Sequence, residues 1–214
     1  MTAAVPATAA QSCAWEVLSS EERLTIAPWL TVRTEKLRLP DGREVEEFVK
    51  LEQPSFVCIY PETADGKVIC LRQYRHGPRR ECVVFPGGHI DRPDESPVSC
   101  ARRELLEETG YIASAWIYLG AFSTNANAGG ATAHMFRATG CRKVAEPDSG
   151  DLEDTKIELL TLPDIIAAAG RGEMPLTTQI ALLGIAANPA LLAALGGAAL
   201  GGPTGLAAVV RAPL

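Results

Sequence analysis

The chain has 214 residues, of which 47% are hydrophobic and 21% are charged, and its formal net charge is −6. This length accommodates one ordinary domain with extensions and disfavours two full domains. The negative charge disfavours a broad basic surface for nucleic-acid backbones, so an anionic substrate would need a metal ion and local arginines.

The chain has six cysteines, Cys13, Cys58, Cys70, Cys82, Cys100 and Cys141. They lack the CxxC and finger-type spacings of metal sites, and several of them lie in apolar stretches. We expect these thiols to be reduced and buried. The N-terminus shows no basic region followed by an apolar run. A cytoplasmic protein is therefore expected.

Residues 1–22 are expected to form a disordered N-terminal extension, because residues 1–11 have the Ala, Thr and Pro content typical of disorder and residues 13–21 carry only a weak pattern. Residues 23–52 predict a β-hairpin. Between Trp29 and Leu51, two alternating segments flank the turn formers Pro-Asp-Gly. Two such strands are marginal alone, so we expect this hairpin to dimerise with a second copy.

Residues 53–188 are predicted to form the main domain. Apolar runs at residues 55–60 and 67–72 predict two strands of a central sheet, and residues 81–85 predict a third strand. This third strand leads directly into residues 85–111, the segment whose residue spacing indicates a functional site.

A helix is predicted from Pro97 to Thr109. Ser96 is typical of an N-cap, Pro97 suits the first helical position, and Gly110 is typical of the residue that ends a helix. At 100° per residue, one stripe of this helix is suited to packing and consists of Val98, Ala101, Leu105 and Thr109.

A second stripe of the same helix gathers the carboxylates of Glu104, Glu107 and Glu108. Like charges at this spacing destabilise a helix. Arg103 can reach Glu107, but a single guanidinium cannot neutralise three carboxylates, so we infer a magnesium-type cation with oxygen ligands. The alternative is a solvated acidic face. That alternative does not explain the preceding Pro-Gly-Gly, whose small residues allow close backbone approach.

Beyond the helix, strands are predicted at residues 115–122 and 132–139, separated by an irregular loop at 123–130. An acidic loop at 144–154 precedes a further strand at 156–162. Two helices are then predicted, at 163–169 and 177–187. The Ala/Gly-rich tail at 189–214 is interrupted by Gly, Pro and Asn, which argues against a membrane span.

The segment around the predicted helix resembles the Nudix box, a glycine and a glutamate followed by R-E-(apolar)-x-E-E-x-G-(apolar). The matching residues are Glu95, Arg103, Glu104, Leu105, Glu107, Glu108, Gly110 and Tyr111. Gly88 and Glu95 are separated by six residues where the family has five, so the loop must bulge by one residue. The resemblance implies an α/β fold, a Nudix-type α/β/α sandwich with a mixed central sheet, here preceded by the N-terminal hairpin.

The resemblance also implies roles for particular residues. The metal, Mg²⁺ with Mn²⁺ as an alternative, would be held by Glu104, Glu107, Glu108 and a backbone carbonyl near Gly87. Gln73-Tyr74-Arg75 is similar to a motif of ADP-ribose hydrolases in which the arginine binds substrate, so Arg75 is the expected substrate cation.

Trp29 lies where relatives carry an aromatic that stacks on the nucleobase, although a packing role is equally compatible with a lone tryptophan. The acidic loop is similar to the one that supplies the water-activating carboxylate in ADP-ribose hydrolases. Glu153 and Asp151 are the candidates, with Glu107 as the alternative base.

The implied activity is magnesium-dependent hydrolysis of the pyrophosphate bond in a nucleoside diphosphate linked to another moiety, ADP-ribose or a nucleotide sugar. The products would be a nucleoside monophosphate and a phosphorylated remainder. Two alternatives stay open, a non-catalytic nucleotide-binding module and an enzyme acting on capped RNA or another nucleotide. The absence of a basic, aromatic-interleaved stretch disfavours a nucleic-acid partner.

Overall fold

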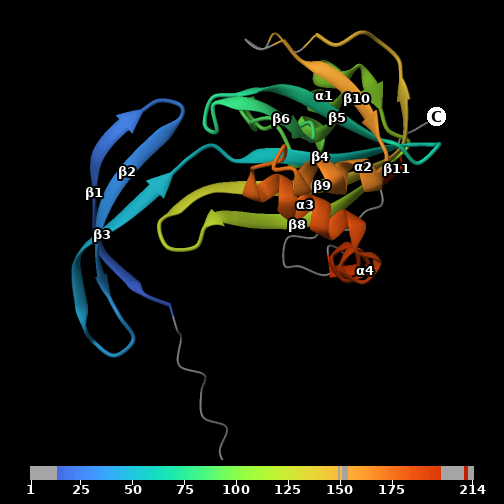
Figure 1. Cartoon of the computed structure of the whole chain (residues 1–214). Helices are drawn as coiled ribbons and strands as arrows, with labels where there is room; N and C mark the ends of the chain where they lie inside the picture. Colours follow the sequence, from blue (N-terminus) through green and yellow to red (C-terminus); the bar gives the residue numbers. More distant parts are fainter. Residues whose placement is uncertain (1–13, 149, 151–153, 199–209, 212–214) are drawn as a thin grey trace, which may run out of the picture. The chain divides into compact units, whose positions relative to one another are not determined.

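A computed structural model describes residues 14–148, 150, 154–198 and 210–211. The chain divides into two compact units (Figure 1). The first unit comprises Met1–Gln53 with Asn125–Gly130, and the second comprises Pro54–Thr124 with Ala131–Leu214. The predicted disorder of residues 1–11 falls outside the described residues.

The first unit is an antiparallel sheet of three strands, β1 (Glu16–Ile26), β2 (Leu30–Arg38) and β3 (Glu44–Glu52). Strands β2 and β3 confirm the predicted hairpin. Strand β1 corrects the expectation of an extension over residues 1–22, which is wrong from Glu16 onward. Two register shifts in the pairing of β1 with β2, between Val17 and Ser19 and between Glu22 and Leu24, interrupt the alternation that would have indicated a strand.

The second unit is built on a mixed sheet, as the sequence predicts. Strand β4 (Phe56–Thr63) pairs in parallel with β9 (Gly129–Lys143) and in antiparallel with β5 (Val68–Arg75). Strand β5 also pairs in antiparallel with β6 (Arg80–Val84) and β10 (Lys156–Leu160). The remaining strands are short β7 (Tyr111–Ile112), long β8 (Ala115–Asn125) and β11 (Val210–Arg211).

Helices cover both faces of this sheet because alternate residues of each strand point to opposite sides (Figure 1). From β4, Val57 and Ile59 join the core with helix α1 (Pro97–Thr109), whereas Cys58 and Tyr60 join the core with helices α2 (Leu162–Gly170) and α3 (Thr177–Ala187). The predicted α/β/α sandwich is confirmed.

The tail contains a fourth helix, α4 (Pro189–Ala198), which the composition of residues 189–214 did not predict. No single described helix has the length and apolar content to cross a membrane. Helices α3 and α4 meet that test only as a pair, over Thr177–Ala187 and Pro189–Leu195, and they are bent by 100° at their junction.

Candidate active site

Helix α1 begins and ends where its sequence predicts. The Ser96 hydroxyl accepts a hydrogen bond from the Ser99 N–H (3.2 Å), and Pro97 occupies the first turn. At the other end, Gly110 adopts φ 73° and donates its N–H to the Leu106 carbonyl (2.8 Å). Because both ends are capped locally, the positions of the three glutamates along the helix are well defined.

The segment that follows β6 lies along the edge of β4. The N–H groups of Ile59 and Val57 donate to the carbonyls of Pro86 (3.0 Å) and Gly88 (2.9 Å). Successive residues of an extended segment face opposite sides. The N–H and carbonyl of Gly87 therefore face away from β4, and this N–H donates to Glu108 Oε2 (2.7 Å).

Both glycines of this segment lie in close contact with their neighbours, Gly87 with backbone and Gly88 with the end of a side chain. A Cβ on Gly87 would overlap the Val57 carbonyl, and a Cβ on Gly88 would overlap the carboxylate of Glu104. Glycine at these positions thus allows the segment to fit between β4 and α1. This confirms the expectation that Pro-Gly-Gly permits close backbone approach.

Glu108 is 7% exposed. The alternative of a solvated acidic face is therefore wrong for Glu108. The Gly87 N–H supplies a partner for its buried carboxylate. The packing stripe is confirmed, since Ala101, Leu105 and Thr109 are buried.

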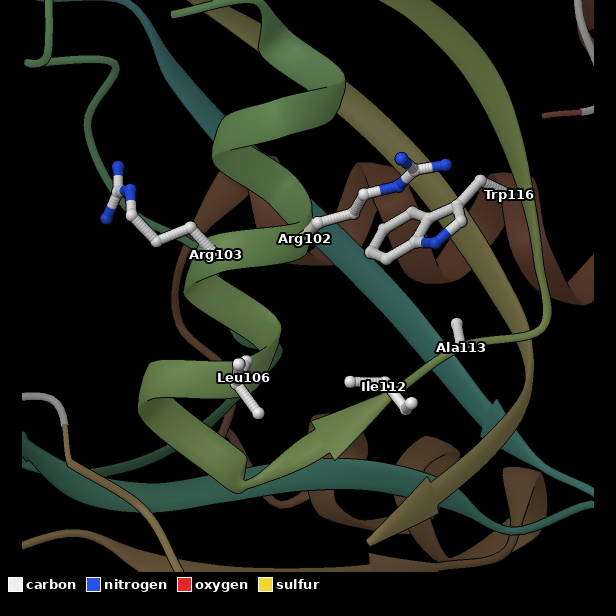
Figure 2. A pocket seen from close by; sticks show the side chains of 6 residues that line it. All are labelled: Arg102, Arg103, Leu106, Ile112, Ala113 and Trp116. Atoms are coloured by element: carbon white, nitrogen blue, oxygen red, sulfur yellow. The ribbon is translucent and has the colours of Figure 1, made fainter. Parts of the chain in front are cut away.

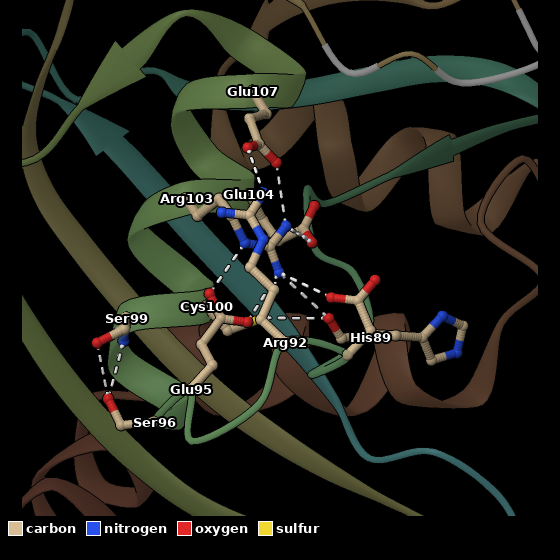
Figure 3. A network of polar contacts seen from close by, with 10 residues as sticks. His89, Arg92, Glu95, Ser96, Ser99, Cys100, Arg103, Glu104 and Glu107 are labelled. Atoms are coloured by element: carbon tan, nitrogen blue, oxygen red, sulfur yellow. Dashed lines mark hydrogen bonds and ion pairs between the residues drawn. The ribbon is translucent and has the colours of Figure 1, made fainter. Parts of the chain in front are cut away.

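Arg103 is the centre of a polar network on α1 (Figure 3). Its guanidinium binds Glu95 through two hydrogen bonds (2.9 and 3.0 Å) and also contacts Glu104 (2.6 Å) and Glu107 (3.0 Å). Arg92 adds a second cation to Glu107 (3.0 Å). The predicted contact between Arg103 and Glu107 is confirmed, and two arginines share the compensation of charge.

The network shifts two carboxyl pKa values in opposite directions. Hydrogen bonds from Arg103 lower the pKa of Glu95 below its usual range. Burial raises the pKa of Glu104, and the positive charge of Arg103 only partly opposes that effect. A further cation beside Glu104 would favour its ionised form.

The loop between Gly88 and Glu95, which is one residue longer than in the family, contains a turn just before the helix. Asp94 adopts a left-handed conformation with φ 59°, and the Glu95 N–H donates to the Arg92 carbonyl (3.2 Å). Beyond this turn Glu95 still reaches Arg103 with both carboxylate oxygens. The extra residue leaves the contact between Glu95 and the helix intact.

The donor set of the site fits a hard divalent cation, because Glu104, Glu107, Glu108 and the Gly87 carbonyl are all oxygen ligands. Gly88 also leaves the space that the Glu104 carboxylate occupies. Within the described part of the chain, no three His, Cys, Asp or Glu side chains are spaced to hold a metal ion. Glu104 and Glu107 each contact Arg103.

Arg75, the predicted substrate cation, is the last residue of β5. The orientation of the Gln73 amide that satisfies both neighbours directs its oxygen to Arg75 Nε (3.0 Å) and its nitrogen to the Thr155 hydroxyl (2.8 Å). Burial raises the pKa of the Cys58 thiol to about 12, with a further rise from the charge of Glu108 and an opposing effect from Arg75.

The acidic loop is anchored to the site at both ends. The Asp148 N–H donates to the Glu107 carbonyl (2.8 Å), and Thr155 contacts Gln73. The predicted bases Asp151 and Glu153 lie outside the described residues. Trp29 belongs to the first unit, follows strand β1 and is 57% exposed.

A cavity of about 360 Å³ lies on another side of α1 (Figure 2). Its walls are mostly apolar and are formed by Arg102, Arg103, Leu106, Ile112, Ala113 and Trp116. Figure 2 shows the Arg102 side chain extending to Trp116, whereas Arg103 points the other way. None of the box glutamates lines this cavity, so we do not assign it to the active site.

Two buried amides of the second unit, Gln73 and Gln179, were not assigned roles from the sequence. Gln179 is 8% exposed and contacts Phe85, which lies 94 positions earlier in the chain. Its signal in the sequence is a single amide followed by eight apolar residues or glycine in the segment TTQIALLGIAA. Such a residue is unfavourable in a buried helix unless its amide is paired.

Comparison with known proteins agrees with this geometry. A family model described as NUDIX domain matches residues 51–175. The chain is 30% identical to an ADP-ribose pyrophosphatase of Mycobacterium tuberculosis over 81% of its length and 82% of the relative's. It is 29% identical to an ADP-ribose pyrophosphatase of Bacillus subtilis over 69% of its length and 79% of the relative's.

Among solved structures, an ADP compounds hydrolase superposes with a TM-score of 0.62 at 22% identity, covering 81% of this chain and 92% of that one. This likeness supports the fold. Together with the family match and the box on α1, it shows that the chain belongs to the NUDIX family and is a hydrolase of the Nudix pyrophosphatase class.

Proposed function

We propose that the chain hydrolyses the pyrophosphate bond of a nucleoside diphosphate linked to another moiety, ADP-ribose or a nucleotide sugar, with Mg²⁺ or Mn²⁺ as cofactor. The observation that carries this proposal is that Glu108 and Glu104 lie against Gly87 and Gly88, on the same helix as Glu107. The similarity to two ADP-ribose pyrophosphatases supports the substrate class.

In this proposal Glu104, Glu107, Glu108 and the Gly87 carbonyl hold the divalent cation. The cation supplies charge neutralisation on the phosphate oxygens. Arg75 binds the diphosphate or the adjoining ribose, and Gln73 holds the Arg75 side chain in place. Trp29 stacks on the nucleobase.

Water attacks one phosphorus, a P–O bond forms, and the bridging P–O bond breaks. The proton of the water passes to Glu153 or Asp151, with Glu107 as the alternative acceptor. The bridging oxygen stays with the second product, where it becomes a phosphate oxygen. One product is a nucleoside monophosphate and the other is the phosphorylated remainder.

A substrate panel tests this proposal. The purified chain is incubated with ADP-ribose, a nucleotide sugar and capped RNA, each with Mg²⁺, with Mn²⁺ and with a chelator. We expect metal-dependent release of a nucleoside monophosphate from ADP-ribose or the nucleotide sugar. Cleavage of capped RNA alone would replace this substrate class. Nucleotide binding by calorimetry without any cleavage would identify a non-catalytic module.

A further inference from the structure

Strand β6 pairs with β5 along one of its two edges, and this pairing ends where the active-site segment begins. It pairs with β5 as far as Val84, and the N–H groups of Val83 and Phe85 face the other edge, as alternate residues of a strand do. The Val83 N–H donates to the Glu173 carbonyl (2.8 Å). The Phe85 N–H donates to Oε1 of Gln179 (2.7 Å). The Gln179 side chain thus occupies the place of a strand partner.

The amide of Gln179 contacts both backbone groups of Phe85. Its Nε2 donates to the Phe85 carbonyl (3.5 Å) and to Cys58 Sγ (3.3 Å). Phe85 is fully buried, and Gln179 is nearly so. A buried amide is stable only where its donors and acceptors are paired, so this side chain and this backbone hold each other in one arrangement.

The arrangement at Phe85 sets the backbone of the next residues. Pro86 and Gly88 are held on one side by the N–H groups of β4. On the side of α3, Gln179 holds the start of the segment. Two residues beyond Phe85, the Gly87 N–H donates to Glu108. Gln179 thus holds the residue at which the segment begins, and Glu108 holds Gly87 two residues later.

We propose that Gln179 is a positioning residue of the active site, which acts through Phe85 to place Gly87 and Glu108 for metal binding. The inference rests on the proposed function, because it assigns Gly87 and Glu108 to the metal. The Gln179 amide contacts Phe85 and Cys58, not the residues assigned to the metal. Its role is therefore visible in metal affinity and in local backbone protection rather than in substrate binding.

The test uses Gln179→Met in the full chain, because methionine has a similar length and lacks the amide. Amide hydrogen exchange measured by NMR should accelerate at Phe85 and Gly87 by tenfold or more. The Mn²⁺ affinity, measured by electron paramagnetic resonance of the free ion, should weaken by about tenfold, as is typical when a group that orients a metal ligand is lost. At limiting metal concentration the kcat should fall together with the metal affinity, and the KM for substrate should change little.

Leu182→Met is the matched control, since Leu182 is a fully buried residue of the same helix. It should keep the wild-type exchange rates at Phe85 and Gly87 and the wild-type Mn²⁺ affinity. Equal effects of the two variants on both measurements would overturn the proposal, because they would reflect packing of α3 alone.

Should Gln179→Met fail to fold, Gln179→Asn provides the same test with a smaller change, since its amide is one methylene too short to reach Phe85. Wild-type exchange and Mn²⁺ affinity in that variant would overturn the proposal. The exchange measurement needs no substrate, so a chain that cleaves none of the panel would contradict the proposed function while leaving this measurement informative.

Discussion

At the scale of single residues, the site depends on carboxylates that are paired before any cation is bound. Glu108 accepts from the Gly87 N–H, and Arg103 contacts Glu95, Glu104 and Glu107. Such pairing orients the carboxylates before a cation binds. Substitutions that remove the charge of one of these residues but keep its shape can therefore be used to test the role of the charge.

Glu108→Gln should lower kcat by about 100-fold or more, because it removes a ligand charge while its side-chain oxygen can still accept from the Gly87 N–H. The thermal midpoint should change little. Steady-state kinetics over a range of Mg²⁺ concentrations would measure the loss, with Glu146→Gln as the control at an exposed glutamate. Near-wild-type metal-dependent turnover by Glu108→Gln would contradict the metal assignment.

Arg103→Met should destabilise the fold most at neutral pH. The pKa of Glu95 is lowered by Arg103, so the stabilisation from this pair is present above the pKa of an unfolded glutamate, about 4.3, and is lost as the pH falls through the lower folded value. We expect a loss of roughly 2 to 3 kcal/mol at pH 7 that shrinks below about pH 4. Urea unfolding across this range measures it.

Arg102→Met serves as the control for that experiment, because the Arg102 side chain extends to Trp116 on another side of the helix. Its effect on stability should be smaller and nearly constant with pH. A pH-independent loss in Arg103→Met as well would mean that packing of the arginine, rather than its charge, stabilises the helix.

At the scale of secondary-structure elements, locally determined features were predictable. Helix α1 has the predicted ends because Ser96 and Gly110 cap it, and helix α3 has them because Pro175 and Pro189 lie next to its ends. Strand β1 was missed because its bulges interrupt the alternation. The burial of Glu108 was missed because it depends on residues 86–88 folding against α1, and the contact of Gln179 joins residues far apart in the sequence.

The acidic loop is the element whose chemistry remains a prediction. Asp151→Asn and Glu153→Gln should have unequal effects, because only one carboxylate can lie in line with the attacking water. The variant that loses the base should show a kcat about 10² to 10⁴ lower with Mg²⁺ affinity nearly unchanged. The other should be close to wild type. If both keep full kcat, Glu107 becomes the candidate base.

At the scale of the whole molecule, the first unit exposes apolar side chains on strands β1 and β3 and on the turn between β1 and β2. Each is about half exposed, and together they are Val17, Leu24, Ile26, Trp29 and Val49. Exposed apolar side chains grouped on a small sheet are typical of a surface that binds another protein. This observation supports the predicted homodimer.

Light scattering at micromolar concentration should therefore give about twice the chain mass of 22.7 kDa. Leu24→Lys should shift the mass toward the monomer because it places a charge in the apolar surface. Ser20→Lys, at an exposed polar position of the same strand, should leave the dimer intact. A monomer mass for the unmodified chain would exclude this mode of association.

The buried cysteines of the second unit can be used to measure transient unfolding of that unit. Cys58, Cys70, Cys82, Cys100 and Cys141 are free and buried. Burial raises the pKa of Cys58, Cys70, Cys100 and Cys141 to about 12. Only the thiolate reacts with alkylating reagents, so these thiols should be labelled only in molecules that have transiently opened. In a Cys13→Ser background, the rate of alkylation should then follow the free energy of opening, and bound metal and nucleotide should slow it.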